Sequence, residues 1–347
     1  MNTVVLDSQE GNQAGRSSYS LIAEYLNLEA AIRVRRSSSH TLASRVIRKA
    51  ISKLAVSSWY GISSLQLEFL AATYDKSKLS LIHMLWADRD WGYLDSISLL
   101  KKIPLIGTFH ACPDDFSSTV SQPQRLRNLD AILLMSEVQK DNFINAGVPE
   151  EHIHVIHHGI DTKHFKPLES SSLEKDYFEI LHVGSYRRNF DVLEQVCDKI
   201  SDHPFVRFKV ITSASLANRF AGRQNVEVVS GLTDQQLLQA YQNASCLLMT
   251  AEAATANNAI LEGISCGLPV VAERIGGIPE YVNENCAILC EPCDVNGLIS
   301  ALEFLSTNQE NCQQMGQAAR KRALELDWVH VAAKTQAVFD QVIAGRQ

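Results

Sequence analysis

The sequence predicts an α/β fold with two doubly wound parallel-sheet domains that face a cleft. Three observations support this fold. The length of 347 residues suits two domains that each bury a core. Both halves alternate short apolar runs with segments of helical periodicity. Most of the apolar runs are continuous rather than alternating, as in parallel strands that are covered on both faces.

The first half begins with the strand, turn and helix that open a doubly wound sheet. Thr3-Val-Val-Leu6 is an apolar strand, the turn contains Gly11 and Gly15, and Tyr19 to Leu26 carries apolar residues at helical spacing. Further strands are expected at 79–83, 103–108, 131–135 and 152–156. These elements predict an N-terminal domain of residues 1–165.

Residues 161–177 interrupt this pattern, because they are polar, lack periodicity and include Pro167. We interpret them as a linker to a second α/β series. Its expected strands are 179–183, 205–211, 226–229, 246–249, 269–272 and 287–289, with helices between them that include 234–243 and 259–266. Ligands of open parallel sheets bind beyond the carboxyl ends of the strands, so the functional site is expected in the cleft between the domains.

Composition and charge exclude several classes of protein. A chain with 46% hydrophobic and 20% charged residues is globular rather than disordered or fibrous. No signal peptide and no apolar run of membrane-spanning length is evident, which predicts a cytoplasmic protein. A net charge of −7 without a recognisable motif argues against nucleic acid as a partner. Cys286, Cys290 and Cys293 lack a second matched pair, so we interpret the first two as core residues rather than metal ligands.

One stretch of the first half is strongly basic. Residues 33–53 contain seven Lys or Arg and no acidic residue, and from Leu42 to Leu54 the apolar residues fall on one helical face. The rest of that helix carries the basic residues Arg45, Arg48, Lys49 and Lys53. Two interpretations stay open. The face is solvated, or it contacts an anionic membrane or a lipid-diphosphate acceptor, which would place the protein at the inner face of the membrane.

The segment from Met249 to Val271 has the character of a phosphate site. A strand ends at Met249, and after a polar loop a helix begins near Asn257 or Asn258. Asparagine caps a helix well, and the free amides and positive dipole of the first turn favour a phosphate. One turn into the helix, Glu262 can accept hydrogen bonds from a vicinal diol such as ribose. The alternative is that Glu262 is a solvated helix residue.

Residues 259–282, which read A-I-L-E-G-I-S-C-G-L-P-V-V-A-E-R-I-G-G-I-P-E-Y-V, resemble the signature of the retaining glycosyltransferase family 4 of the GT-B fold. Three further segments resemble that family in order along the chain: Pro104 to His110, Glu137 to Pro167, and Asp327-Trp328. The resemblance covers about residues 100–345. It implies a Rossmann-like acceptor domain (1–165), a Rossmann-like nucleotide-sugar domain (166–326) and a helix that returns to the first domain (327–347).

The resemblance also assigns donor-binding residues. Glu262 matches the second glutamate of an E-x7-E pair and is expected to hold the donor ribose. A loop whose backbone amides meet the donor sugar and phosphate matches Ala256, Asn257, Asn258 and Ala259. Gly184 begins a loop that usually carries basic residues for the diphosphate, so Arg187 or Arg188 is expected to supply that charge. A surface pair at the start of a helix is the alternative for these arginines.

On the acceptor side, His110 matches a histidine near the reacting sugar, although a lone histidine is often structural. Gly11 and Gly15 match the acceptor-side glycine turn. No metal is implied, because no Asp-x-Asp stands at a strand end and arginines with a helix N-terminus can offset the diphosphate charge. No cofactor is expected beyond the nucleoside-diphosphate sugar, which is a substrate.

One departure from the family pattern bears on catalysis. The first glutamate of E-x7-E falls at Ala254, and the nearest carboxylate, Glu252, stands two positions earlier. Three possibilities follow. Glu252 reaches the site through a rearranged loop, another polar group such as Asn257 replaces the carboxylate, or the chain binds a donor without turning it over.

The sequence therefore predicts a retaining transferase that moves a hexosyl group from a nucleoside-diphosphate sugar to a glycan or glycolipid, in polysaccharide or glycoconjugate biosynthesis. Two alternatives remain. One is a GT-B relative with another reaction, such as a sugar phosphorylase or a nucleotide-sugar epimerase. The other is a non-catalytic nucleotide-sugar-binding partner, which the alanine at 254 suggests.

Overall fold

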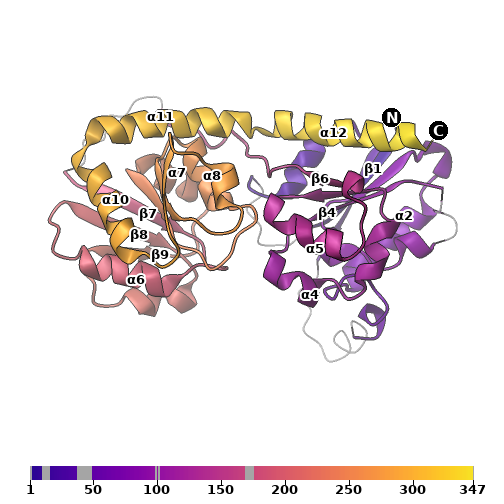
Figure 1. Cartoon of the computed structure of the whole chain (residues 1–347), viewed down its shortest axis with the longest axis horizontal. Coiled ribbons are helices and arrows are strands. Elements are labelled where there is room, and N and C mark those ends of the chain that lie inside the picture. The colour runs from indigo at the N-terminus through magenta and orange to yellow at the C-terminus, as the bar shows by residue number, and fades with distance from the viewer. Residues whose placement is uncertain are drawn as a thin grey trace. The chain divides into compact units, whose positions relative to one another are not determined.

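The computed structural model describes residues 2–9, 16–36, 49–97, 100, 102–168 and 176–346. The chain forms two compact units, Met1–Gly159 with Trp328–Gln347 (unit 1) and Ile160–Asp327 (unit 2) (Figure 1). The sequence predicts the first boundary after residue 165, whereas Ile160 already groups with unit 2. The reason is local: the Ile160 N–H donates to the Leu326 carbonyl at 3.0 Å, and Phe165 packs in the core of unit 2.

Unit 1 contains a parallel sheet, whose order in the described part of the chain is β2-β1-β3-β4-β5-β6. Its strands are β1 (Thr3–Gln9), β2 (Ala30–Arg35), β3 (Leu81–Met84), β4 (Leu105–Phe109), β5 (Ala131–Leu134) and β6 (Ile153–Val155). Because β1 lies between β2 and β3, the order of strands reverses there. The carboxyl ends of β1 and β3 are thus the ligand-binding position that doubly wound sheets favour.

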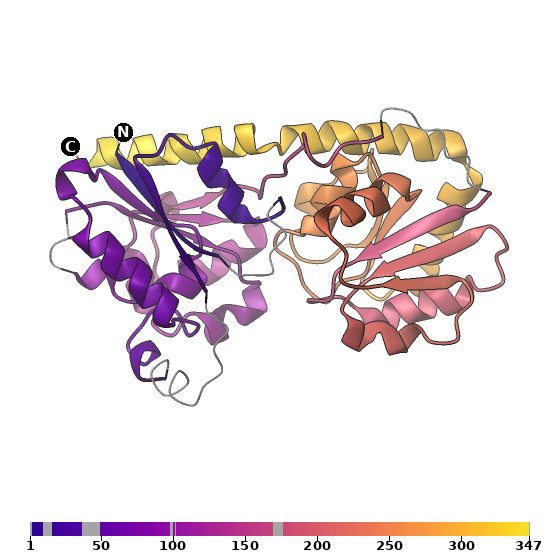
Figure 2. The same ribbon diagram turned by 180° about the vertical axis from the view of Figure 1, so that it is seen from behind.

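Helices cover both faces of this sheet. Helix α2 (Ile62–Thr73) packs against β1 and β2, while α12 (Trp328–Gly345) packs on unit 1 beside the 3-10 helix η1 (Tyr19–Glu24) (Figures 1 and 2). The Phe339 ring of α12 lies 5.1 Å from that of His83, and the Arg346 Nε donates to Asp130 at 2.7 Å. The shorter helices are η2 (Lys76–Lys78), α3 (Ala87–Asp90), η3 (Leu94–Ser96), η5 (Pro113–Asp115), α4 (Phe116–Thr119), η6 (Pro123–Asn128), η7 (Glu137–Gln139), α5 (Lys140–Asn145) and η8 (Glu150–His152).

Unit 2 contains a second parallel sheet, of order β12-β11-β10-β7-β8-β9. Its strands are β7 (Phe178–Val183), β8 (Val206–Ile211), β9 (Val226–Val229), β10 (Cys246–Met249), β11 (Val270–Glu273) and β12 (Ala287–Cys290). Here the order of strands reverses between β7 and β10. Each strand predicted for this half is present, and its ends differ from the prediction by at most one residue.

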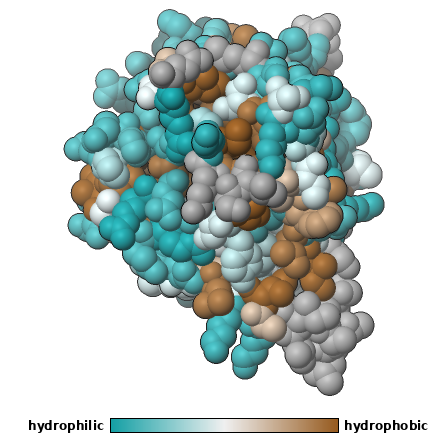
Figure 3. Space-filling view, turned by 90° about the vertical axis from the view of Figure 1, so that its right-hand side faces the viewer, coloured by the Kyte–Doolittle hydropathy of each residue, from teal (hydrophilic) through white to brown (hydrophobic). Residues whose placement is uncertain are grey.

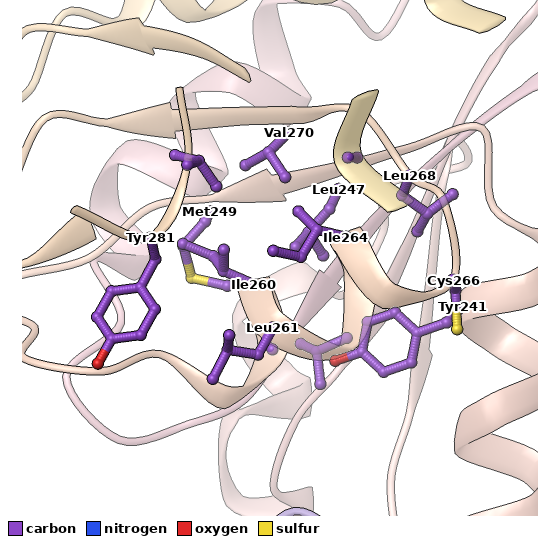
Figure 4. Packing of buried hydrophobic residues seen from close by; sticks show 14 of the residues in the cluster. Tyr241, Leu247, Met249, Ile260, Leu261, Ile264, Cys266, Leu268, Val270 and Tyr281 are labelled. Atoms are coloured by element: carbon purple, nitrogen blue, oxygen red, sulfur yellow. The ribbon is translucent and has the colours of Figure 1, made fainter. Parts of the chain in front are cut away.

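Two hydrophobic clusters cover the two faces of this sheet. On one face lie α6 (Phe190–Lys199) and α10 (Val295–Thr307), and on the other lie α7 (Asp234–Asn243), α8 (Asn258–Ser265) and α11 (Gln309–Glu325). Strand residues alternate between the clusters, so Leu248 packs with α6 and α10, while Leu247 and Met249 meet Ile260 and Ile264 of α8 (Figure 4). The remaining helices are η9 (Ala214–Phe220) and α9 (Ile278–Tyr281). None of the described helices is both long and apolar enough to span a membrane.

Candidate functional site

The candidate site of unit 2 lies where the chain leaves β7 and β10, at the reversal of strand order. Helix α8 begins there, capped by Asn257, whose Oδ1 accepts the Ile260 N–H at 3.3 Å. Asn257 and Ala259 are buried, Ala256 is half-buried and Asn258 is exposed. The first turn of α8 therefore presents backbone amides and the positive end of the helix dipole at this edge of the sheet, a setting that favours an anion.

Arg188 forms hydrogen bonds both to the end of β7 and to the cap of α8. Its Nε donates to the Val183 carbonyl at 3.0 Å, and its Nη2 donates to the Asn257 Oδ1 at 3.3 Å. Gly184 makes this path possible. Its φ is +111°, and a Cβ there would lie 2.7 Å from the Arg188 Nη2. Arg188 is thus a built part of the site and not a residue of an exposed surface pair.

Arg187 is placed differently. It has a left-handed backbone with φ of 54°, and its guanidinium carbon lies 5.9 Å from the centre of the Tyr186 ring. Its carbonyl accepts the Glu252 N–H at 3.0 Å. The backbone of Arg187 therefore holds the loop after β10, while Arg188 contributes the charge beside the helix N-terminus.

Glu262 is buried within this site, with 4% of its surface exposed, which excludes the alternative of a solvated helix residue. Its carboxylate faces Tyr241 and Arg188. Burial, together with Glu262, raises the pKa of Tyr241 well above its ordinary value. Burial lowers the pKa of Arg188, which Tyr241 and Glu262 oppose. The positive charge of Arg188 and the hydroxyl of Tyr241 stabilise the buried carboxylate. Without a partner, a buried charge would lower the stability of the fold by roughly several kcal/mol.

Backbone hydrogen bonds hold the loop after β10 in place. Ala254 is buried, and its carbonyl accepts the Gly277 N–H at 2.9 Å. A Cβ at Gly276, whose φ is +53°, would collide with that same carbonyl, so a glycine is required there. The side chain of Glu252 is exposed. Of the two polar candidates to replace the missing carboxylate, Asn257 is the one in contact with Arg188.

A second buried carboxylate, Glu273, was not predicted from the sequence. It ends β11, and its two oxygens accept the Ala251 N–H at 2.9 Å and the Cys293 N–H at 2.7 Å. Glu273 thereby ties the loop after β10 to the loop after β12. The available signal was a glutamate directly after the apolar strand predicted at 269–272. Because backbone amides engage both oxygens, we regard Glu273 as a positioning residue.

His182 lies in β7 and is buried. Its Nε2 donates to the Thr250 hydroxyl at 3.3 Å, since that hydroxyl itself donates to the Asn189 carbonyl at 2.9 Å. Burial, helped by Arg188, lowers the pKa of His182 to about 3. The imidazole is therefore neutral at physiological pH and holds Thr250, the first residue after β10.

In unit 1, His110 follows β4 and belongs to an aromatic cluster. Its ring lies 4.2 Å from the Trp86 ring and 4.8 Å from the Tyr19 ring, and its Nε2 donates to the Leu85 carbonyl at 2.8 Å. Burial, helped by Arg89, lowers the pKa of His110 to about 3. A histidine that is neutral at physiological pH can form hydrogen bonds but cannot act as a general acid there.

Two charged residues after β3, Asp88 and Arg89, lie beside this aromatic cluster and are not predicted from the sequence. Asp88 Oδ2 accepts the backbone N–H groups of His110 at 2.8 Å and Ala111 at 2.9 Å. The Arg89 guanidinium lies 4.1 Å from the Trp86 ring centre and donates to the Ser8 carbonyl at 3.1 Å. The signal was the charged run Asp88-Arg89-Asp90 directly after an apolar strand.

Some predicted residues cannot be placed. Gly11, Gly15, Arg45 and Arg48 lie outside the described residues. Lys49 and Lys53 are described, and both are exposed. The acceptor-side glycine turn and half of the proposed basic face therefore stay predictions.

Comparison with known proteins matches both halves of the chain. Residues 32–164 match the model described as Glycosyltransferase Family 4, and residues 177–308 match the model described as Glycosyl transferases group 1. The MMP alpha-(1->4)-mannosyltransferase of Mycolicibacterium hassiacum is 28% identical over 240 residues, which are 64% of this chain and 57% of that protein. The sulfoquinovosyl transferase SQD2 of Arabidopsis thaliana is 28% identical over 58% of this chain and 42% of that protein. The chain thus spans about half the length of these curated relatives.

A solved structure is similar over the full length. Anabaena HepE in complex with UDP has a TM-score of 0.75 and 17% identity, covering 98% of this chain and 100% of that one. At this identity the similarity concerns the fold, which is two Rossmann-like parallel-sheet units. The two family matches, the strand orders of both sheets and this structural similarity agree: the chain belongs to the group 1 and family 4 glycosyltransferases and has their GT-B fold.

Proposed function

We propose that the chain transfers a hexosyl group, with retention of anomeric configuration, from a nucleoside-diphosphate sugar to a glycan or glycolipid hydroxyl. The observation that carries the proposal is Arg188 held against the N-terminus of α8, with Glu262 buried beside it. This arrangement pairs positive charge for a diphosphate with an acceptor for ribose hydroxyls. The related HepE structure contains UDP, which supports a nucleotide-sugar donor here as well.

Catalysis in this proposal rests on charge stabilisation and positioning. The bond between the anomeric carbon and the diphosphate oxygen breaks, and the leaving oxygen keeps the electron pair. Arg188 and the first amides of α8 stabilise that developing charge, so no metal ion is needed for it. The acceptor oxygen then bonds to the anomeric carbon and transfers its proton to the departing diphosphate oxygen, which holds the electron pair of the broken bond. His110 enters as a hydrogen-bonding group near the sugar and not as an acid, because it is neutral.

The proposed acceptor follows from the family and from the basic stretch of unit 1. A glycan or a lipid-linked sugar fits the family, and a role in polysaccharide or glycoconjugate biosynthesis follows from either. The basic stretch that includes Lys49 and Lys53 supports an acceptor presented at an anionic membrane surface, at the inner face of the membrane of a cytoplasmic protein.

Transfer rates with UDP-, GDP- and ADP-hexoses and a panel of acceptors test the proposal. Arg188→Met keeps the side-chain bulk and removes the charge, so we expect kcat/KM to fall about 100-fold or more. Glu262→Gln is expected to raise the donor KM about tenfold, because a ribose hydroxyl loses a charged acceptor. Arg219→Met is the matched control, since Arg219 forms ion pairs with Asp191 and Glu194 elsewhere on unit 2. Wild-type kinetics in both site variants would refute these assignments.

A second function, binding without turnover, is favoured by one observation. Ala254 stands where the family has a carboxylate facing the donor sugar, and its buried position is fixed by the Gly276-Gly277 turn. Tight nucleotide-sugar binding with no transfer or hydrolysis on any acceptor would support that function. Phosphate-dependent cleavage of a disaccharide, or a product formed without any acceptor, would instead indicate a phosphorylase or an epimerase.

A further inference from the structure

Unit 2 has a cavity at the amino-terminal edge of its sheet, which we call the amino-edge cavity. Its volume is about 980 Å³, within the range of sites that bind small molecules. It lies at the amino ends of β7, β8 and β10, and it is bordered by the last turns of α7 and α10 and the first turn of α11. The candidate donor site lies at the carboxyl ends of β7 and β10. The two sites are therefore separated by the length of a strand, about 20 Å.

Two exposed aromatic side chains line this cavity. Phe205, just before β8, is 61% exposed, and Tyr177, just before β7, is 38% exposed. Such rings offer rigid apolar faces to a ligand, with a polar edge in the case of tyrosine. Tyr177 also lines a second cavity, of about 320 Å³, beside β7, β8 and β9. The hollow surface thus continues along the edge of the sheet, which suits an extended ligand.

Amide side chains surround the aromatic rings of the amino-edge cavity. Exposed apolar residues alone do not define a site, since Figure 3 shows hydrophobic residues on the surface of unit 1 as well. Here, however, α11 adds Gln309 and Gln313, which lie four residues apart on one face of the helix, and α7 adds Gln242 and Asn243. Each amide carries both donors and an acceptor, as do the neighbouring hydroxyl groups of a sugar. The lining therefore fits a ligand that combines apolar faces with many hydroxyls.

His203, in the loop before β8, supplies a further polar group. It lines the cavity, and its Nδ1 is buried without a hydrogen-bond partner among the residues that the structure describes. A buried polar atom without a partner is unfavourable. A hydroxyl would satisfy it in either tautomer of the imidazole, because a hydroxyl both donates and accepts. A ligand rich in hydroxyls thus suits the histidine as well as the amides.

The charges along this edge select a neutral ligand. The described residues that line the amino-edge cavity include one acid, Asp176, and no lysine or arginine. Beside the second cavity, Glu179 and Glu227 outnumber Arg207. This excess of acidic groups disfavours phosphate, sulfate and carboxylate, and with them nucleotides, anionic lipids and anionic polysaccharides. The concave shape favours a small ligand over a protein partner.

We propose that the amino-edge cavity binds a neutral oligosaccharide, in a site separate from the donor site. The rings of Tyr177 and Phe205 pack against the apolar C–H faces of the sugars, and the amides of α7 and α11 form hydrogen bonds with their hydroxyls. The inference goes beyond the proposed transfer reaction, because none of the donor-site residues takes part and binding at this cavity needs no turnover.

Isothermal titration with maltohexaose, cellohexaose and mannohexaose tests the proposal. We expect at least one of these neutral hexasaccharides to bind the wild-type chain with a dissociation constant of about 1 mM or lower. Tyr177→Ala combined with Phe205→Ala is expected to weaken that binding about tenfold or more, because both apolar faces are lost. The fold is expected to persist, since the hydrogen bond from the Phe178 N–H to the Phe205 carbonyl involves the backbone alone.

Two further variants sharpen this test. Gln309→Ala combined with Gln313→Ala removes two amides from the exposed side of α11 and is expected to weaken binding about fivefold or more. Phe69→Ala is the matched control, because Phe69 is 64% exposed, much like Phe205, but lies on unit 1. It is expected to bind like wild type. A saturating nucleotide sugar is expected to leave the hexasaccharide affinity unchanged, since the two sites lie at opposite ends of the strands.

Three results would overturn the proposal: no binding of any hexasaccharide at about 10 mM, wild-type affinity in either cavity variant, or displacement of the bound hexasaccharide by a nucleotide sugar. The last result would place the glycan at the donor site instead. Donor binding and transfer measured on the same variants are expected to be unchanged, so failure of the amino-edge cavity and failure of the transferase proposal are distinguishable.

Discussion

The Arg188 guanidinium lies directly against Gly184 at the end of β7. The glycine has a left-handed backbone, and its missing side chain is what allows the guanidinium to reach both the strand end and Asn257. The donor site therefore depends on a glycine at position 184, because the methyl group of an alanine would collide with the guanidinium. The charge of Arg188 is useful only because Gly184 lets it lie there.

Gly184→Ala is expected to displace the Arg188 guanidinium and weaken nucleotide-sugar binding about tenfold or more, because the new Cβ would lie 2.7 Å from Nη2. Gly222→Ala is the matched control. Gly222 also has a positive φ, of 86°, but a Cβ there meets nothing within 4 Å. Both variants are expected to lose about 1 kcal/mol of stability from backbone strain. Isothermal titration separates them, and equal donor affinity in the two variants would contradict the role given to Gly184.

Among the elements, those that build the donor site follow most directly from sequence. Short segments rich in apolar residues located every strand of unit 2, and Asn257 marked the start of α8, because these features depend on local residues alone. Strand β2 and helix α2 are among the elements of unit 1 that were not predicted. Strand β2 pairs with β1 at the edge of its sheet and is only partly buried, so it alternates with arginines and lacks an apolar run. Helix α2 buries both polar and apolar side chains and also exposes both kinds, so it has no apolar stripe that periodicity could detect.

Helix α2 also contains a carboxyl group, that of Glu68, whose pKa lies near physiological pH. Burial raises the pKa of Glu68 to about 7, above an ordinary value of 4.5. The folded protein therefore holds this proton more tightly than the unfolded chain. Its contribution to stability is fully present below pH 4.5, roughly, and is lost as pH rises through about 7. A shift of this size corresponds to about 3 kcal/mol in the free energy of unfolding.

Glu68→Gln removes the titration while keeping the shape of the side chain. Denaturant unfolding at about pH 5 and about pH 8 measures the effect. The wild-type free energy minus that of the variant is expected to be larger at the lower pH, by up to about 3 kcal/mol. Parallel pH profiles of the two proteins would show that Glu68 does not titrate in this range.

At the scale of the whole molecule, each of the two parallel sheets has its own cluster of charged and polar groups. In each unit the charged and polar groups gather where the order of strands reverses: Arg188 and Glu262 in unit 2, Asp88 and Arg89 in unit 1. This position could be predicted from strand order alone. The buried carboxylate network of Glu273 and the pairing of Arg188 with Asn257 could not, because they depend on loop conformations that residue patterns do not encode. The observed boundary after Gly159 differs from the predicted one after residue 165 for a similar reason, since contacts with distant residues hold Ile160 and Phe165 in unit 2.

The central claim is that unit 2 holds a nucleoside diphosphate between Arg188, the N-terminus of α8 and Glu262. Thermal unfolding of the wild-type chain with UDP-, GDP- and ADP-sugars tests it most directly. A ligand at about 100 times its dissociation constant stabilises the folded state by about 2.7 kcal/mol, which gives a measurable rise in Tm. We predict such a rise for one nucleotide class, and its loss in Arg188→Met but not in Arg219→Met. No rise with any nucleotide sugar, or an equal rise in Arg188→Met, would contradict the claim.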